Sequence, residues 1–258
     1  MADGMNFDKY IDNPNGGSQV VTNRKMYKDL YTSKFNKILL REEGNINYKV
    51  YHQNNKNDTY YIHMKIPSEV ISNFYYDVVV QLSTTEAPKK ANNILRQYMV
   101  RFFSNDPAFV YTFVHAFNKN NLFIKDLESK MNKHALHTNA KIRNPKDEVF
   151  YVKSLYFAYL TMERYNLFDR RVLDRKAVKY DKKILLNDIE TADKKISKRI
   201  ELANKKEDTD KEKNVRLPKQ NDKSVPIAKT AKVSKITPKT NYVKTTKRSK
   251  IIGKRNTS

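Results

Sequence analysis

The sequence predicts an α+β fold followed by a long basic C-terminal arm. In the first half of the chain, short segments alternate apolar and polar residues, as half-buried strands do. Farther along, apolar residues recur every three or four positions, as in amphipathic helices. A small antiparallel sheet within residues 35–104, with helices over residues 106–165, accounts for both observations.

The N-terminal segment, residues 1–24, is expected to be a flexible lead, because it contains the turn-forming run NPNGGS at positions 13–18. The globular α+β domain is expected over residues 25–170. It begins with a helix at residues 25–40, although the apolar residues at the end of that segment fit a helix or a strand equally well.

Four segments are predicted strands. Ile46–His52 and Tyr60–Ile66 alternate apolar and polar residues, and the polar run QNNKND between them predicts a turn. Phe74–Leu82 and Tyr98–Phe103 are rich in β-branched and aromatic residues, which favour strands. Turn signals between consecutive segments indicate antiparallel pairing.

The helical half begins at Asp106-Pro107, where an N-cap acceptor precedes a proline at the first helical position. The helix that follows places an aromatic residue at every fourth position from Phe109 to Phe117. A second such pair, Asn144-Pro145, predicts a helix over residues 146–165. A charged amphipathic helix is predicted over residues 171–206, and its limited apolar pattern suits an exposed helix that pairs with another.

The aromatic-rich part of the chain also predicts a surface where subunits meet. Tyr and Phe exceed what one helical face needs, and aromatic residues are enriched at protein interfaces. The simpler interpretation, which the sequence favours for this aromatic block, is an ordinary hydrophobic core. The candidate interface residues are Phe102, Phe103, Phe109, Tyr156, Tyr159, Leu185, Ile189 and Ile196.

Composition and motifs argue against several classes of site. The 258 residues include no cysteine, which excludes disulfides and thiolate ligands, and no apolar run is long enough to span a membrane. Glycine-rich phosphate loops and hydrolase motifs are absent from the sequence, so we expect neither an enzyme nor a cofactor. His134 and His137 have no third ligand nearby and are expected to be surface residues rather than a metal site, and His115 is expected at the edge of the core.

The C-terminal arm, residues 207–258, holds much of the excess charge. The whole chain has 51 basic and 28 acidic residues, whereas its last 36 residues have eleven basic and none acidic. Such a segment repels itself and is expected to contact a polyanion, of which nucleic acid is the densest. The candidate nucleic-acid-binding residues are Lys223, Lys229, Lys232, Lys235, Lys239, Lys244, Lys247, Arg248, Lys250, Lys254 and Arg255.

Two other uses of the arm stay open. Apolar residues such as Val225, Ile227, Val233 and Ile236 suit an arm that docks as an extended peptide on a neighbouring subunit. The lysines would then keep the arm soluble before assembly. A tail that only increases solubility is the remaining alternative.

The aromatic blocks FFSNDPAFVYTFVHAFN at residues 102–118 and KSLYFAYLTMERY at residues 153–165, together with the Lys- and Asn-rich composition and the basic tail, resemble structural proteins of tailed bacteriophages. The similar proteins are neck, ring or head-to-tail connector components. The resemblance implies a non-enzymatic protein present in many copies, whose arms thread between neighbours and reach packaged DNA.

The leading prediction is therefore a virion structural protein, an oligomeric neck or ring component or part of the capsid–tail junction. Its expected partners are its own copies, other virion proteins and nucleic acid, and its expected locations are the virion and, during assembly, the host cytoplasm. The alternative is a free nucleic-acid-binding protein that uses the basic tail for sequence-independent phosphate contacts. A third hypothesis, an enzyme acting on nucleic acid, finds no catalytic constellation in the sequence.

Overall fold

The computed structural model describes residues 5–12, 21–54, 58–84, 94–150 and 152–215. Residues 1–216 form one compact unit, and residues 217–258 form a second unit that lies outside the described residues. The predicted arm residues from Lys223 to Arg255 belong to that second unit. The fold described below is therefore that of the first unit.

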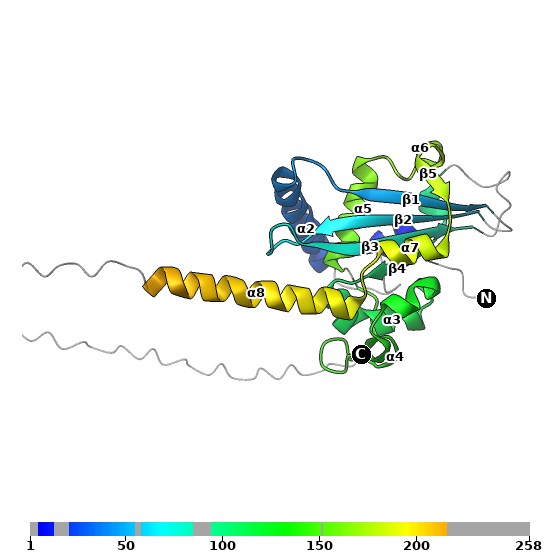
Figure 1. Cartoon of the computed structure of the whole chain (residues 1–258). Coiled ribbons are helices and arrows are strands. Elements are labelled where there is room, and N and C mark those ends of the chain that lie inside the picture. Colours follow the sequence, from blue (N-terminus) through cyan, green and yellow to red (C-terminus); the bar gives the residue numbers. More distant parts are fainter. Residues whose placement is uncertain (1–4, 13–20, 55–57, 85–93, 151, 216–258) are drawn as a thin grey trace, which may run out of the picture. The chain divides into compact units, whose positions relative to one another are not determined.

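The centre of this unit is a five-stranded sheet with the strand order β4-β3-β2-β1-β5 (Figure 1). The first four strands pair antiparallel with their neighbours, and β5 lies parallel to β1 at one edge. The strands are β1 (Tyr48–Asn54), β2 (Asp58–Pro67), β3 (Tyr75–Ser83), β4 (Met99–Ser104) and β5 (Ala177–Lys179).

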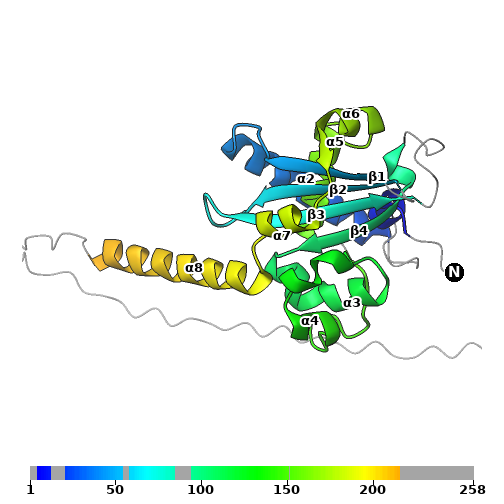
Figure 2. The same ribbon diagram turned by 45° about the vertical axis from the view of Figure 1, so that its right-hand side comes forward.

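Helices pack on both faces of the sheet. On one face, α5 (Lys153–Arg164) crosses β2, β3 and β4, and α2 (Val21–Arg41) packs against α5. The opposite face meets α7 (Lys182–Asp188) and the start of α8 (Ala192–Val215), which then extends away from the sheet (Figure 2). The other helices and helical turns of the described residues are α1 (Phe7–Asp12), Leu95–Gln97, Phe109–Phe113, α3 (Val114–Lys119), Lys125–Lys130, α4 (Lys133–His137) and α6 (Arg170–Lys176).

Strand β2 lies at the middle of the core. Nine of its ten residues are buried, because helices cover the sheet on both sides. Since successive side chains of a strand point to opposite faces, Ile62 and Met64 share the face of β2 that α5 covers, and Tyr61 and His63 share the other. The core is therefore built in three layers: helix, sheet, helix.

The structure confirms the predicted α+β class and an antiparallel sheet of four consecutive strands. All four strands begin and end within two residues of their predicted limits. The predicted cap at Asp106 is also present, because Asp106 Oδ1 accepts a hydrogen bond of 3.0 Å from the backbone N–H of Ala108. Strand alternation and helix capping depend on the local sequence, which explains why the sequence predicts the strands and this cap correctly.

Two predictions about the ends of the domain are wrong. Residues 7–12 are not a flexible lead, since they form α1, and Phe7 and Tyr10 are completely buried among other aromatic rings. The predicted limit of the charged helix, at residue 206, lies inside α8, which continues to Val215. Residues 1–4 and 13–20 lie outside the described residues.

Two predicted helices are also wrong in extent. The predicted helix at 146–165 starts only at Lys153, because Asn144 closes a local turn with Glu148 and Asp147 adopts a φ of 53°, in the left-handed region. The predicted helix over 171–206 is divided into α6, β5, α7 and the first part of α8. Asp181 starts α7 by accepting a hydrogen bond of 2.7 Å from the N–H of Lys183.

The predicted subunit interface is wrong, because all eight of its side chains pack in or against the hydrophobic core of the single chain. Seven of the eight are buried, with Phe102 and Leu185 completely enclosed, and Tyr159 is half-buried against the same core. These residues, Phe102, Phe103, Phe109, Tyr156, Tyr159, Leu185, Ile189 and Ile196, therefore stabilise the fold of the single chain.

The core role of Phe102 can be tested by Phe102→Ala. Its ring lies 5.4 Å from that of Phe7 and 4.7 Å from that of Tyr10, and none of its surface is exposed. We expect a loss of about 3–5 kcal/mol in the free energy of unfolding, measured with urea, that does not depend on protein concentration. A loss of stability that appears only at high protein concentration would indicate that Phe102 lies in a subunit interface. The control is Tyr111→Ala, at a more exposed aromatic residue.

Candidate site at the joint of helix α8

A buried carboxylate holds the sheet to the segment that leads into α8. Asp77, in β3, has no exposed surface, and its oxygens accept hydrogen bonds from His63 Nε2 (2.8 Å) and Lys65 Nζ (2.5 Å) on the neighbouring strand β2. Asn105, just after β4, donates to Asp77 from Nδ2 at 2.8 Å and accepts from the backbone N–H of Asp77. The carboxylate thus joins three consecutive parts of the sheet.

The same carboxylate also holds the chain between α7 and α8. The backbone N–H of Glu190 donates to Asp77 Oδ2 at 3.2 Å, and Asn105 Nδ2 donates to the carbonyl oxygen of Glu190 at 3.2 Å. Lys65 Nζ also donates to the carbonyl oxygen of Asp188 at 3.3 Å. Asp188 itself accepts from Tyr51 and Lys49 of β1, so the end of α7 is fixed to the sheet.

Electrostatics keep Asp77 ionised. Burial alone would raise the pKa of Asp77, but the hydrogen bonds and charges of His63 and Lys65 outweigh it and hold the pKa well below its usual range. The pKa of Asp188 is lowered for a similar reason, because burial is outweighed by Lys49 and Tyr51. A charge that is buried and paired in this way is costly to separate from its partners.

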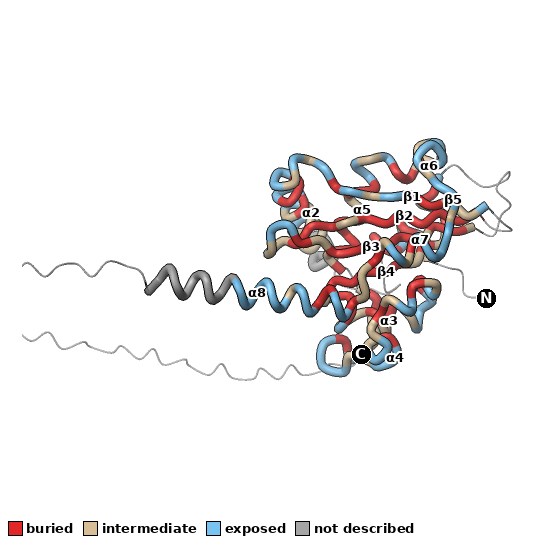
Figure 3. Tube along the Cα trace, in the orientation of Figure 1, coloured by how far each residue is buried: buried red, intermediate tan, exposed pale blue. Residues whose placement is uncertain are grey.

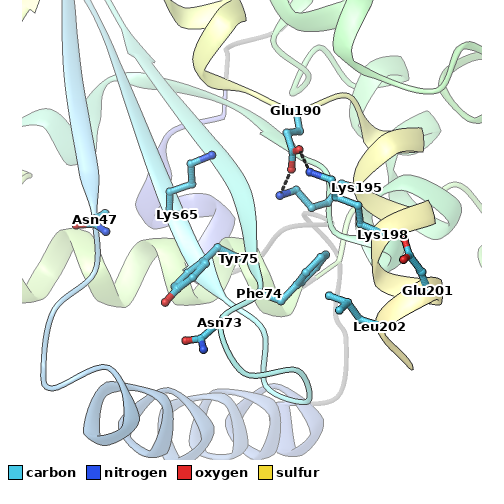
Figure 4. A pocket seen from close by; sticks show the side chains of 10 residues that line it. All are labelled: Asn47, Lys65, Asn73, Phe74, Tyr75, Glu190, Lys195, Lys198, Glu201 and Leu202. Carbon is cyan, nitrogen blue, oxygen red and sulfur yellow. Dashed lines mark hydrogen bonds and ion pairs between the residues drawn. The ribbon is translucent and has the colours of Figure 1, made fainter. Parts of the chain in front are cut away.

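A pocket of about 490 Å³ opens beside Lys65 and Glu190, between the β2–β3 hairpin and α8 (Figure 4). Its cationic side chains are Lys65, Lys195 and Lys198, and its aromatic side chains are Phe74 and Tyr75. Lysines and aromatic rings around one cavity are the groups that nucleic-acid phosphates and bases contact. Whether these lysines can bind such a ligand depends on how far they are already paired.

Glu190 engages two of the three lysines. Both Lys195 and Lys198 form ion pairs with its carboxylate, as Figure 4 shows, and these pairs lower the pKa of Glu190 although burial would raise it. The ammonium group of Lys195 also lies 5.2 Å from the centre of the Phe74 ring, and Lys195 is buried. With Lys65 bound to Asp77, the arrangement fastens α8 to the hairpin and leaves little free positive charge in the pocket.

A second buried carboxylate, Asp58, fastens α6 to the other end of the sheet. It contacts His52 Nε2 at 2.6 Å and Arg170 Nη2 at 3.1 Å and accepts from the Tyr98 hydroxyl at 3.0 Å. The His52 ring stacks on Tyr60 with centroids 4.3 Å apart. Because these charges satisfy one another, the cluster explains the position of α6 and supplies no unpaired catalytic group.

The remaining histidines agree with their predicted positions. His134 and His137 are exposed on α4, and His115 is partly buried with its Nδ1 2.9 Å from Asp147 Oδ1. Among the residues that the structure describes, no three His, Cys, Asp or Glu side chains gather closely enough to hold a metal ion. None of the helices in this part of the chain is long and apolar enough to cross a membrane.

The candidate nucleic-acid residues predicted from the sequence, Lys223 to Arg255, lie outside the described residues. The residues that do meet here, Asp77, His63 and Lys65, were missed. Their signal is a charged or ionisable side chain inside an otherwise apolar strand, in FYYDVVVQL and YYIHMKI. Such residues are normally paired when buried, which would have predicted a polar cluster.

Comparisons of the chain with protein-family models, with curated proteins and with solved structures find no match.

Because Asp77 is buried and paired with His63 and Lys65, the substitution Asp77→Asn should lower the stability of the fold strongly. Removing one charge from a buried pair leaves Lys65 and His63 without their counter-ion, so we expect a loss of about 3–5 kcal/mol in the free energy of unfolding at pH 7, measured with urea. Glu201→Gln, which removes a carboxylate from an exposed ion pair with Lys205 on α8, should leave the stability unchanged. A variant at Asp77 as stable as the parent would contradict the account of the joint.

The same variant has a predictable pH dependence. The folded-state pKa of Asp77 lies below its ordinary value of 3.8, so its stabilisation is complete above that value and is lost as the pH falls through the folded-state pKa. The stability difference between the parent chain and Asp77→Asn should therefore be constant above about pH 5 and shrink below about pH 4.

Proposed function

We propose that this chain is a non-enzymatic nucleic-acid-binding protein in which the folded domain carries the basic arm. The observation that carries the proposal is the separation of charge along the chain. Residues 216–258 have 13 basic residues and one acidic residue, whereas residues 1–215 have 38 and 27. A segment with so little internal neutralisation attracts a polyanion, and each phosphate it neutralises releases a counter-ion.

The joint of α8 supports this division of roles. Asp77 and Glu190 hold the start of α8, and the helix becomes exposed within three turns of its start (Figure 3). The helix ends at Val215, directly before the basic segment in the sequence. A firmly held helix followed by a cationic segment suits a protein whose domain stays folded while its arm contacts phosphates without reading bases.

A second candidate is the oligomeric virion component that the resemblance implies. The observation that favours it is the exposed part of α8, where Ile200 is 54% and Leu202 is 41% exposed. Apolar side chains on an exposed helix suit a contact with another protein chain. In this case the arm would reach packaged DNA or cross a neighbouring subunit.

The nucleic-acid proposal is tested with the full chain carrying Lys229→Gln, Lys232→Gln, Lys235→Gln and Lys239→Gln. Binding to a fluorescent random duplex is measured by anisotropy from 50 to 300 mM salt. We expect the slope of log affinity against log salt to fall by about 2–4 units, because each lost phosphate contact contributes about 0.9.

The matched control replaces four exposed lysines of the folded domain, Lys37, Lys133, Lys141 and Lys146, by Gln. It removes the same charge and should change the slope by less than about one unit. Equal slopes for the parent chain and the arm variant would overturn the nucleic-acid role of the arm.

The two candidates differ in assembly. A virion component should form a closed oligomer without DNA, whereas a free nucleic-acid-binding protein should stay a monomer until DNA is added. Mass photometry of the parent chain and of Ile200→Glu separates them: a closed oligomer that the substitution disrupts supports the virion role, and a monomer in both samples removes it.

A further inference from the structure

The edge of the sheet at β5 carries an unusually basic segment. Residues 169–183 run through α6, β5 and the start of α7 and contain seven basic and three acidic residues. Among the described residues, β5 pairs only with β1, so its other side is the open edge of the sheet. The seven basic residues are Arg170, Arg171, Arg175, Lys176, Lys179, Lys182 and Lys183.

The acidic residues of this segment are directed to the protein itself. Asp169 and Asp181 accept backbone hydrogen bonds at the starts of α6 and α7, from Arg171 N–H at 2.9 Å and Lys183 N–H at 2.7 Å. Asp174 accepts a hydrogen bond from the Tyr60 hydroxyl. Asp169 also pairs with Arg171 at 3.2 Å, Asp174 pairs with Arg170 at 3.7 Å, and Lys182 pairs with Asp126 at 3.1 Å. Among the described residues, these pairs leave four of the seven basic residues without an ion pair: Arg175, Lys176, Lys179 and Lys183.

Several basic side chains are, in contrast, unpaired. Lys179 and Lys183 are exposed and have no hydrogen bond or ion pair from their side chains among the described residues. Arg175 is exposed, and within the described ranges its side chain donates only to the carbonyl oxygen of Arg171, at 3.0 Å. Exposed cations that have no carboxylate partner in the protein are available to an anionic ligand.

The surface around β5 is also hollowed on both sides. A cavity of about 650 Å³ is lined by Arg170, Lys179 and the carboxylate of Asp174, and another of about 620 Å³ by Lys49, Lys176 and Ile184. Val178 of β5 lines both cavities and is 56% exposed. Arg170 and Lys49 are paired with Asp58 and Asp188, so the positive charge without a carboxylate partner is Lys179 in one groove and Lys176 in the other. A ridge between two open grooves with these lysines offers room for a phosphodiester backbone, which needs positive charge along a track more than a closed pocket.

We propose that the β5 edge, defined by Arg175, Lys179, Lys183 and the two grooves beside them, is a second nucleic-acid-binding surface that contacts phosphates independently of the arm. This inference rests on the proposed function, because it concerns the same ligand class. The folded surface would fix the strand against the domain, while the arm supplies contacts that require no defined geometry. Lysine and arginine contacts of this kind carry no base specificity of their own.

The test uses the full chain with Arg175→Gln, Lys179→Gln and Lys183→Gln, and a fluorescent 20-mer of deoxythymidine as the probe. Each lost contact to a single strand contributes about 0.7 to the salt slope, so we expect the slope to fall by about 2 units. The control variant carries Lys37→Gln, Lys133→Gln and Lys141→Gln, which removes three exposed charges elsewhere. An unchanged slope in the β5-edge variant, or the same change in the control, overturns the proposal.

The outcome is distinguishable from that of the arm experiment. If the β5-edge variant keeps the parent slope while the arm variant loses most of it, the second surface is absent and the proposed function stands. If the arm variant keeps the parent slope while the β5-edge variant loses it, the folded edge binds and the arm does not. When all variants are measured on the same 20-mer, combining both sets of substitutions should lower the slope by the sum of the two effects, because each lost phosphate contact retains its own counter-ion.

Discussion

The buried carboxylate of Asp77 is the constraint on which the rest of the described structure depends. A fully buried charge must be paired with good geometry, and Asp77 finds its partners on β2, after β4 and between α7 and α8. Each partner lies in a different part of the chain, so the elements must come together for the charge to be satisfied. The position of the start of α8 follows from this requirement, and Glu190 continues it with two lysines of α8.

In this arrangement the lysines that line the pocket beside α8 are already paired with groups of the domain. Lys65, Lys195 and Lys198 line a pocket that would otherwise suit an anion, but each is used to hold α8. Unpaired cations of the described residues include Lys179 and Lys183 at the β5 edge, and a further thirteen basic residues follow α8 in the sequence. The paired charges beside α8 therefore stabilise the fold, and the proposed nucleic-acid contacts fall to other basic residues.

The sequence predicts the sheet well, because alternation in β1 and β2 and β-branched composition in β3 are properties of each strand alone. It predicts the helices less well, because the left-handed residue Asp147 and the cap at Asp181 end or start helices at positions that periodicity does not reveal. It misses the Asp77 cluster, whose partners are far apart in the chain. It also assigns Phe102 to an interface, since aromatic composition alone does not distinguish a chain's own core from a contact between chains.

The central claim, that the basic segment after α8 binds nucleic acid while the Asp77 joint stays intact, is tested most directly by lysine acetylation footprinting of the parent chain. Labelling is quantified for each lysine by mass spectrometry, with and without a saturating random duplex. The account predicts strong protection of the lysines from Lys223 to Lys254 and unchanged labelling of Lys37 and Lys133. Equal labelling of the arm lysines with and without the duplex would contradict it.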